Sequence, residues 1–315
     1  MSTASGPRIA LTGASSCTGH WIAHALHAEG FEVHALCSRR ADRYSGRRQL
    51  LLRSLAGLLP IHFELDARAG ALAHWVRRHR PELWIHHHHP MQDFRSPDYD
   101  LEQAREVAIA PLEALLDALA ETQCRGVVFS GSYFEPGEGG PEAPTTRTPY
   151  AHSKAETWEA LCRGCEVRGL PLSKVVIPNA TGPLESPERL VPALVRASRE
   201  SRPFVVASPE SVTDALPARE LGGVYAEAAH GLLEGRAAVL RPSGLPVAVG
   251  SWARTVLQEL VGPRLGLRPC PLAEASASVG PVLRYSNPRT ERRPIQWLSF
   301  WDEYAAWLRR HPRVV

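Results

Sequence analysis

The sequence predicts an α/β fold, a doubly wound parallel sheet followed by a smaller C-terminal lobe. Three observations support this prediction. Short apolar runs alternate with helical patterns through the first half, the first run leads into a glycine turn, and proline-rich mixed segments follow Pro183. Strand–helix alternation of this kind produces a parallel sheet covered on both faces. Ligands of such sheets bind beyond the carboxyl ends of the strands.

The predicted strands are the short apolar segments. They are expected at residues 8–12, 32–37, 61–65, 83–86, 126–130 and 172–177. Helices are expected at residues 20–30 and 101–122, and a further helix carries Tyr150 and Lys154. The Gly/Pro-rich residues 135–149 are expected to form a surface loop that borders a pocket.

Composition limits the partners. With 36 basic and 33 acidic residues among 315, the net charge of +3 is too small to indicate a nucleic acid or a membrane surface. No apolar run reaches the roughly 18 residues that a membrane span needs. The first residues lack the basic and apolar regions of a signal peptide, so we expect a cytoplasmic protein with a small-molecule substrate.

The six cysteines show no disulfide framework. Cys162 and Cys165 form a CxxC, but in a helical stretch with no second pair nearby. We interpret them as reduced, packed thiols; a redox or metal role is the alternative.

A glycine turn follows the first predicted strand. Gly13 opens it and Gly19 closes it, with Ser16 at the position where a middle glycine is expected. A tight turn needs the first glycine, and close helix–strand packing needs the last. The helix start can then face a pyrophosphate with its N–H groups and positive dipole end. The turn residues Ser16, Cys17 and Thr18 are therefore candidate cofactor ligands.

The end of the second strand carries basic residues. An acidic residue there accepts a hydrogen bond from the adenosine ribose, whereas a basic residue accommodates a 2′-phosphate. Ser38 and Arg39 stand at this position, and no acid does. We therefore favour NADP(H) over NAD(H) as cofactor, the alternative being a solvated basic turn.

Tyr150 and Lys154 are spaced as YxxxK at the start of a helix, so their side chains lie one turn apart on one face. A nearby ammonium group favours the phenolate form of tyrosine and can hold the nicotinamide ribose. Ser132, just past the fifth strand, can hydrogen-bond a substrate oxygen. The pattern predicts an acid–base centre; the alternative is an exposed helix turn.

Four consecutive histidines occupy positions 86–89. Side chains alternate along a strand, so consecutive histidines do not all converge on one ion, and we predict no metal site. We expect one or two of them to face the cofactor, with His88 lining its site, and the others to pack.

Taken in order, these motifs resemble those of the extended short-chain dehydrogenase/reductase family, the NAD-dependent epimerase/dehydratase group. Its TGxxGxxG is similar to Thr12–Gly19, its IHLAA to Ile85–His89, its NxxGP to Asn179–Pro183, and its serine and YxxxK to Ser132 and Tyr150–Lys154. The resemblance implies a Rossmann-like domain over residues 1–182 with a return segment near 205–232. It also implies a mainly substrate-binding lobe over 183–315, a homodimer, and cofactor contacts at Asp66 and Pro178.

Departures from the family pattern bear on the substrate. Ser16 replaces the central glycine, the arginine before the NxxGP asparagine is missing, and the late RDF signature becomes Thr213–Ala215. Family dehydratases follow the serine with an Asp-Glu pair, whereas Tyr133 and Phe134 stand here. We therefore expect reduction of a carbonyl on a small or aromatic metabolite, with Tyr150 as proton donor. The alternatives are a nucleotide-sugar epimerase and a non-catalytic NADP-binding sensor.

The C-terminal residues 297–307 place aromatic side chains near helical spacing. We expect an amphipathic helix that packs its aromatic face on the smaller lobe, with a substrate-stacking platform as the alternative.

Overall fold

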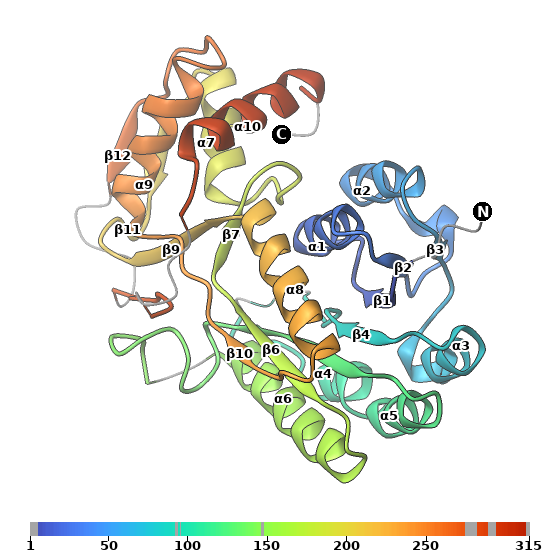
Figure 1. The fold of residues 1–315 in the computed structure, drawn as a ribbon. Helices are drawn as coiled ribbons and strands as arrows, with labels where there is room; N and C mark the ends of the chain where they lie inside the picture. The colour runs from blue at the N-terminus through green and yellow to red at the C-terminus, as the bar shows by residue number, and fades with distance from the viewer. Residues whose placement is uncertain are drawn as a thin grey trace. The chain divides into compact units, whose positions relative to one another are not determined.

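A computed structural model describes residues 6–91, 94, 96–145, 148–274, 282–288 and 294–312. It divides into two compact units, which are described separately below. The first contains residues up to Glu138, Thr145–Ile177 and Leu221–Pro242. Its centre is a seven-stranded parallel sheet in the order β10-β6-β5-β4-β1-β2-β3, so the predicted doubly wound α/β fold is confirmed (Figure 1).

The strands of this sheet are the six predicted apolar runs and one short edge strand, β10, that the sequence pattern does not predict. They are β1 Arg8–Thr12, β2 Glu32–Leu36, β3 Ile61–His62, β4 Leu83–His86, β5 Gly126–Ser132, β6 Leu172–Ile177 and β10 Val239–Leu240. Every residue of β4 and β5 is buried, as expected for strands covered on both faces.

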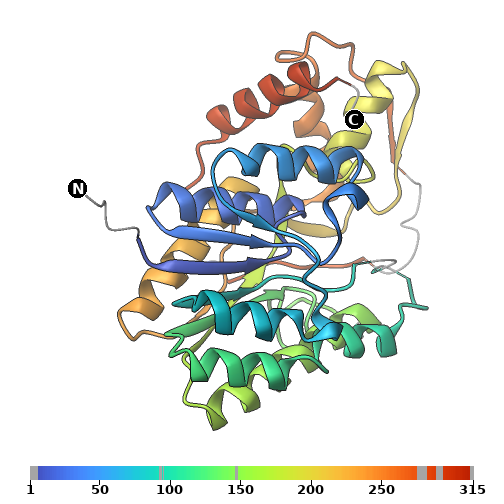
Figure 2. The same cartoon turned by 90° about the vertical axis from the view of Figure 1, so that its right-hand side faces the viewer.

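Helices cover both faces of the sheet. They are α1 Cys17–Ala28, α2 Gly46–Ala56, α3 Ala71–His79, α4 Leu101–Ala108, α5 Leu112–Glu121, α6 Pro149–Val167 and most of α8 Ala218–Leu233. The helices α1 and α2 lie on one face, and α3, α5 and α6 lie side by side on the other (Figures 1 and 2). At the start of α6, the Thr148 side chain accepts from the Ala151 N–H and Pro149 occupies the first turn, where a missing N–H costs nothing.

Two predicted elements differ in extent from those in the structure. The helix predicted over residues 101–122 is two helices, α4 and α5, because Pro111 cannot continue the hydrogen-bond ladder and instead stands at the start of α5. The third strand stops after His62, and Glu64 two residues later adopts a left-handed φ of 63° that no regular strand contains.

The second unit contains residues 139–144, Pro178–Glu220 and Ser243–Val315. It has a three-stranded sheet of β11 Leu245–Ala248, β9 Val212–Pro217 and β7 Asn179–Thr181, and a pair formed by β12 Leu272–Glu274 and β8 Phe204–Val206. Its helices are α7 Leu190–Arg199, α9 Val249–Val256, a π-turn at Leu257–Val261, and α10 Trp297–Arg310.

The return segment lies later in the chain than predicted. Residues 205–220 stay in the second unit because β9 pairs with β7 and β11, and the chain rejoins the large sheet only at Leu221–Pro242. The predicted aromatic packing helix is α10: Trp301 and Tyr304 are buried, and Trp301 contacts Trp252 of α9 with ring centroids 5.3 Å apart. None of the helices described is long and apolar enough to span a bilayer.

Candidate active site

The candidate site residues of the first unit gather at the carboxyl ends of neighbouring strands. The chain winds one way from β1 through β2 to β3 and the other way from β4 to β6, so β1 and β4 flank the point where the strand order reverses. Loops at such a point diverge and leave room for a ligand. The glycine turn follows β1, the four histidines begin at the end of β4, and Ser132 ends β5.

The glycine turn has the geometry expected of a tight anion-binding loop. Gly13 adopts a φ of +74°, and a Cβ there would stand 3.1 Å from both the His87 ring and the His88 backbone nitrogen. A Cβ on Gly19 would stand 2.2 Å from the Gly13 carbonyl oxygen. Both glycines are therefore required by the local packing. Ser16 caps α1 by accepting from the Gly19 N–H at 3.0 Å, and its hydroxyl donates to the Gly13 carbonyl at 2.9 Å.

His87 joins this turn to the interior of the sheet. Its Nε2 lies 2.9 Å from the Thr18 hydroxyl and 3.2 Å from the Ser16 hydroxyl, and its Nδ1 lies 2.7 Å from the Ser130 hydroxyl. Ser130 in turn lies 2.6 Å from the hydroxyl of Tyr225 on α8. Burial lowers the pKa of His87 to about 3, so its ring is neutral at physiological pH.

The other three histidines have different surroundings. His86 is buried, and neither of its ring nitrogens has a hydrogen-bond partner among the described residues. His88 packs on His86, with ring centroids 4.5 Å apart, and burial lowers its pKa to about 4. His89 bonds the Ser153 hydroxyl of α6 at 2.9 Å. Within the described part of the chain, no group of three or more His, Cys, Asp or Glu residues is arranged to hold a metal ion.

The predicted adenosine-side residues lie at the ends of β2 and β3. Ser38 and Arg39 are exposed, and the Arg39 N–H donates to the Tyr44 hydroxyl at 3.3 Å. The Asp66 carboxylate is held by the Arg68 guanidinium at 2.8 Å, which lowers the pKa of Asp66. Pro178 directly follows β6 and begins the segment Pro178–Glu220 of the second unit.

Tyr150 and Lys154 lie on the first turns of α6, and both are buried. The rings of His89, Phe94 and Tyr99 surround Tyr150 with centroids 5.5 to 5.7 Å away. The Lys154 ammonium donates to the Ser130 carbonyl at 2.5 Å and lies over the Phe129 ring.

The expected stabilisation of the Tyr150 phenolate by Lys154 is not seen in this structure. Burial raises the pKa of Tyr150 above its ordinary value, and the negative charge of Glu135 raises it further. Burial also lowers the pKa of Lys154 to about 8, so a fraction of this group becomes neutral near physiological pH.

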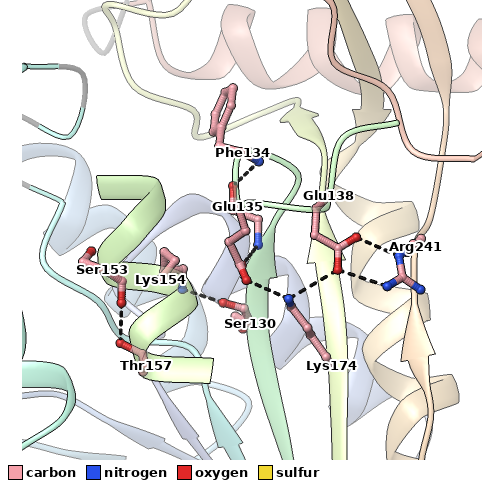
Figure 3. Close-up of polar contacts among 10 residues, drawn as sticks. Ser130, Phe134, Glu135, Glu138, Ser153, Lys154, Thr157, Lys174 and Arg241 are labelled. Atoms are coloured by element: carbon pink, nitrogen blue, oxygen red, sulfur yellow. Dashed lines mark hydrogen bonds and ion pairs between the residues drawn. The ribbon is translucent and has the colours of Figure 1, made fainter. Parts of the chain in front are cut away.

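Ser132 is fixed by Glu135, three residues further along the chain. The Glu135 carboxylate accepts from the Ser132 backbone N–H at 2.5 Å and from Lys174 of β6 at 2.7 Å. Lys174 also pairs with Glu138 at 3.4 Å, and Glu138 pairs with Arg241 at 2.7 Å (Figure 3). Three of these four charges are buried, which makes the chain of ion pairs a rigid support for the end of β5.

Sequence reasoning missed five residues of this constellation, which are Ser130, Glu135, Lys174, His87 as a link to the glycine turn, and Tyr225. One signal in the sequence could have pointed to Lys174: the chain has only two lysines among its 36 basic residues, Lys154 and Lys174, and both are buried here. A charge that rare, placed inside apolar strand and helix patterns, indicates a buried partner.

The CxxC cysteines are separate thiols in this structure. Cys165 belongs to the core beneath α5 and α6, and burial raises its pKa to about 12. Burial also raises the pKa of Cys162. Thiols with raised pKa values are poor nucleophiles and poor metal ligands, which supports the interpretation of packed thiols.

The residues around the glycine turn fit a dinucleotide. The turn needs glycine at position 13, its helix presents the positive end of its dipole there, and Thr18 adds a half-buried hydroxyl in the first turn. The orphaned nitrogens of His86 and the basic Arg39 add polar groups at neighbouring strand ends. This donor set suits phosphate and ribose oxygens.

Known proteins of similar sequence or fold bear on the family of this chain. The model of the NAD dependent epimerase/dehydratase family matches residues 9–234. Among curated proteins, none matches this chain by sequence.

Solved structures with the same fold have low sequence identity to this chain. The UDP-glucose 4-epimerase of Thermotoga maritima, solved with UDP-glucose, has a TM-score of 0.76 and 16% identity over 97% of this chain and 100% of its own. The Streptomyces venezuelae dTDP-glucose 4,6-dehydratase DesIV, solved with NAD and TYD, has a TM-score of 0.74 and 20% identity over 96% and 97%. Pal from Bacillus thuringiensis has a TM-score of 0.76 and 12% identity over 96% and 99%.

Proposed function

Because this chain belongs to the NAD-dependent epimerase/dehydratase family, we propose that it is an enzyme that exchanges a hydride with an oxygen-bearing carbon of its substrate. The observation that carries this proposal is the set of Ser132, Tyr150 and Lys154, which one compact unit holds beside a glycine turn suited to a dinucleotide. A bound nicotinamide cofactor would accept or return the hydride.

The chain's own residues handle the proton and the substrate oxygen. Because burial raises the pKa of Tyr150, its hydroxyl is protonated at neutral pH and can donate to an oxygen that gains charge. The Ser132 hydroxyl can hydrogen-bond the same oxygen, and Glu135 fixes the backbone that carries it. Lys154, one turn after Tyr150 on α6, would hold the nicotinamide ribose.

For the substrate we favour a nucleotide sugar and a reaction that inverts one carbon by oxidation and re-reduction. This assignment is supported by the epimerases among the solved structures of the same fold. Net reduction of a carbonyl is the second candidate, because Thr213 replaces the arginine of the family's late signature and no Asp-Glu pair follows Ser132.

One assay separates the two candidates. The purified protein is incubated with NAD(H) or NADP(H) and a panel of UDP- and dTDP-sugars, and separately with aromatic ketones and aldehydes. Reduced nicotinamide absorbs at about 340 nm, so its absorbance reports net consumption of the cofactor. An epimerase yields the inverted sugar with no net change of this absorbance. A reductase consumes one reduced cofactor for each molecule of product. If the protein turned over no compound of either panel, and if Tyr150→Phe behaved like the wild type in every assay, the non-catalytic sensor would be favoured.

We also propose NADP(H) as the preferred cofactor, supported by the exposed Arg39 at the end of β2 and by Arg47 and Arg48 in the first turn of α2. Arg39→Ala is expected to weaken NADPH binding about tenfold and to leave NADH binding nearly unchanged. Titration of protein fluorescence with both cofactors measures this. Tighter binding of NADH than of NADPH by the wild type would contradict the preference.

A further inference from the structure

The hydroxyl of Tyr225 begins a hydrogen-bond chain whose direction can be deduced. Tyr225 is fully buried, and the Ser130 hydroxyl at 2.6 Å is its hydrogen-bond partner. If Tyr225 accepted this bond, its own hydrogen would be buried without a partner, a state that costs about 1–3 kcal/mol. Tyr225 therefore donates to Ser130.

The direction of the Tyr225–Ser130 hydrogen bond also fixes which nitrogen of His87 carries its hydrogen. Ser130, having accepted from Tyr225, uses its one hydrogen on the Nδ1 of His87 at 2.7 Å. A neutral imidazole that accepts at Nδ1 carries its hydrogen on Nε2. His87 is neutral because burial lowers its pKa to about 3. Its Nε2–H consequently donates to the Thr18 hydroxyl at 2.9 Å.

The last donor in this series of hydrogen bonds is the hydroxyl group of Thr18. The hydroxyl has already accepted from His87. The Ser16 oxygen is 3.4 Å away, which is too long for a good O–H···O bond, and it already accepts from the Gly19 N–H at 3.0 Å. Thr18 is half-buried at the second position of α1, so its hydrogen can reach a ligand beside the helix start. The direction of the chain leaves a donor there, which suits an anionic oxygen.

We propose that His87, oriented by Ser130 and Tyr225, is a positioning residue that keeps the Thr18 hydroxyl as a hydrogen-bond donor to the phosphate of the bound nucleotide. This inference rests on the proposed function, because it needs a nucleotide at the glycine turn. The arrangement also gives a role to the histidine run: His87 orients the Thr18 hydroxyl as a donor at the turn where Ser16 replaces the middle glycine.

The tautomer of His87 is the first test. Nitrogen-15 NMR of histidine-labelled protein distinguishes a protonated Nε2 from a protonated Nδ1, and the wild type should show His87, assigned by its loss in His87→Phe, with the hydrogen on Nε2. Tyr225→Phe removes the orienting hydrogen and should shift this signal toward a mixture of tautomers. Tyr99→Phe, which removes another buried hydroxyl of the same unit, should leave the signal unchanged. A wild-type hydrogen on Nδ1 would overturn the proposal.

Phosphate-dependent affinity is the second test. The ratio of the dissociation constants of adenosine and ADP isolates the contribution of the phosphates. Thr18→Val and His87→Phe should each lower this ratio about tenfold or more, as expected for loss of a hydrogen bond to a charged group, while Thr18→Ser should retain it. Adenosine affinity itself should change little, which a merely disrupted fold would not allow.

The outcomes separate the two proposals. Failure of the wild type to bind ADP or either dinucleotide would overturn the proposed function. If the wild type binds ADP and the ratio of the adenosine and ADP dissociation constants is unchanged in Thr18→Val and His87→Phe, only the proposed role of the hydrogen bonds from Tyr225 to Thr18 is overturned.

Discussion

At the scale of single residues, the site depends on charged groups that are kept away from water. Lys154 illustrates the cost. An ammonium group in a buried position loses its hydration, and one carbonyl at 2.5 Å and one aromatic face replace only part of it. The protein tolerates this cost at the position where we propose a donor to the nicotinamide ribose, and groups with perturbed pKa values are typical of functional sites.

This cost predicts how stability depends on pH. Burial lowers the pKa of Lys154 from 10.5 to about 8, so between these values the unfolded chain holds a proton that the folded protein has lost. The free energy of unfolding contributed by Lys154 therefore rises with pH across this window. Relative to Lys154→Met, the wild type should gain about 3 kcal/mol from pH 8 to pH 10.5 in urea unfolding experiments. Parallel curves for the two proteins would contradict this prediction.

The buried pair of Glu135 and Lys174 predicts a compensating double variant. Lys174→Met leaves two buried carboxylates, Glu135 and Glu138, without their shared cation and should lower the free energy of unfolding by about 3–5 kcal/mol. Glu138 keeps its ion pair with Arg241, so adding Glu135→Gln removes the carboxylate charge that Lys174 alone had balanced and should restore part of the loss. Chemical denaturation of the single and double variants measures both effects; a double variant less stable than Lys174→Met would refute the pairing.

At the scale of elements, α8 is the segment that completes the first unit. It supplies Tyr225 to the hydrogen-bond chain, and its Leu232 side chain lies against Gly126 at the start of β5. It also crosses α1 closely, because a Cβ on Gly222 would stand 2.6 Å from the Trp21 carbonyl oxygen and 2.8 Å from the Ala25 Cβ. A helix that close to its neighbour needs glycine at the contact.

The two adjacent glycines of α8 give a matched pair of variants. Gly222→Ala should destabilise the protein by about 1–3 kcal/mol, since the added methyl group forces α8 away from α1. Gly223→Ala meets open space and should stabilise the protein by up to about 1 kcal/mol, because alanine loses less backbone entropy in a helix. Thermal unfolding of both variants is the measurement. Equal effects would show that α8 does not pack on α1 at Gly222.

At the scale of the whole molecule, the sequence predicted the sheet better than the site. Apolar runs such as residues 83–86 are recognisable because both faces of each strand are buried. In the site, Tyr150 and Lys154 are recognisable because they belong to one short sequence motif. The partners of His87 lie 43 and 69 residues away, and Tyr225 lies a further 95 residues beyond Ser130. No local pattern encodes such pairings, because only the strand order brings these residues together.

The same reasoning explains why the first unit needs the segment Leu221–Pro242 that returns to it. Residues 1–182 lack α8 and β10, which pairs Val239 with Lys174 in the large sheet. The fragment 1–182 would expose the apolar surface that α8 covers and leave Ser130 without Tyr225. We expect it to unfold without a cooperative transition in circular dichroism. A fragment in which a flexible Gly/Ser linker joins Ile177 to residues 221–242 restores both elements and should unfold cooperatively. Cooperative unfolding of the fragment 1–182 itself would show that the first unit does not need its return segment.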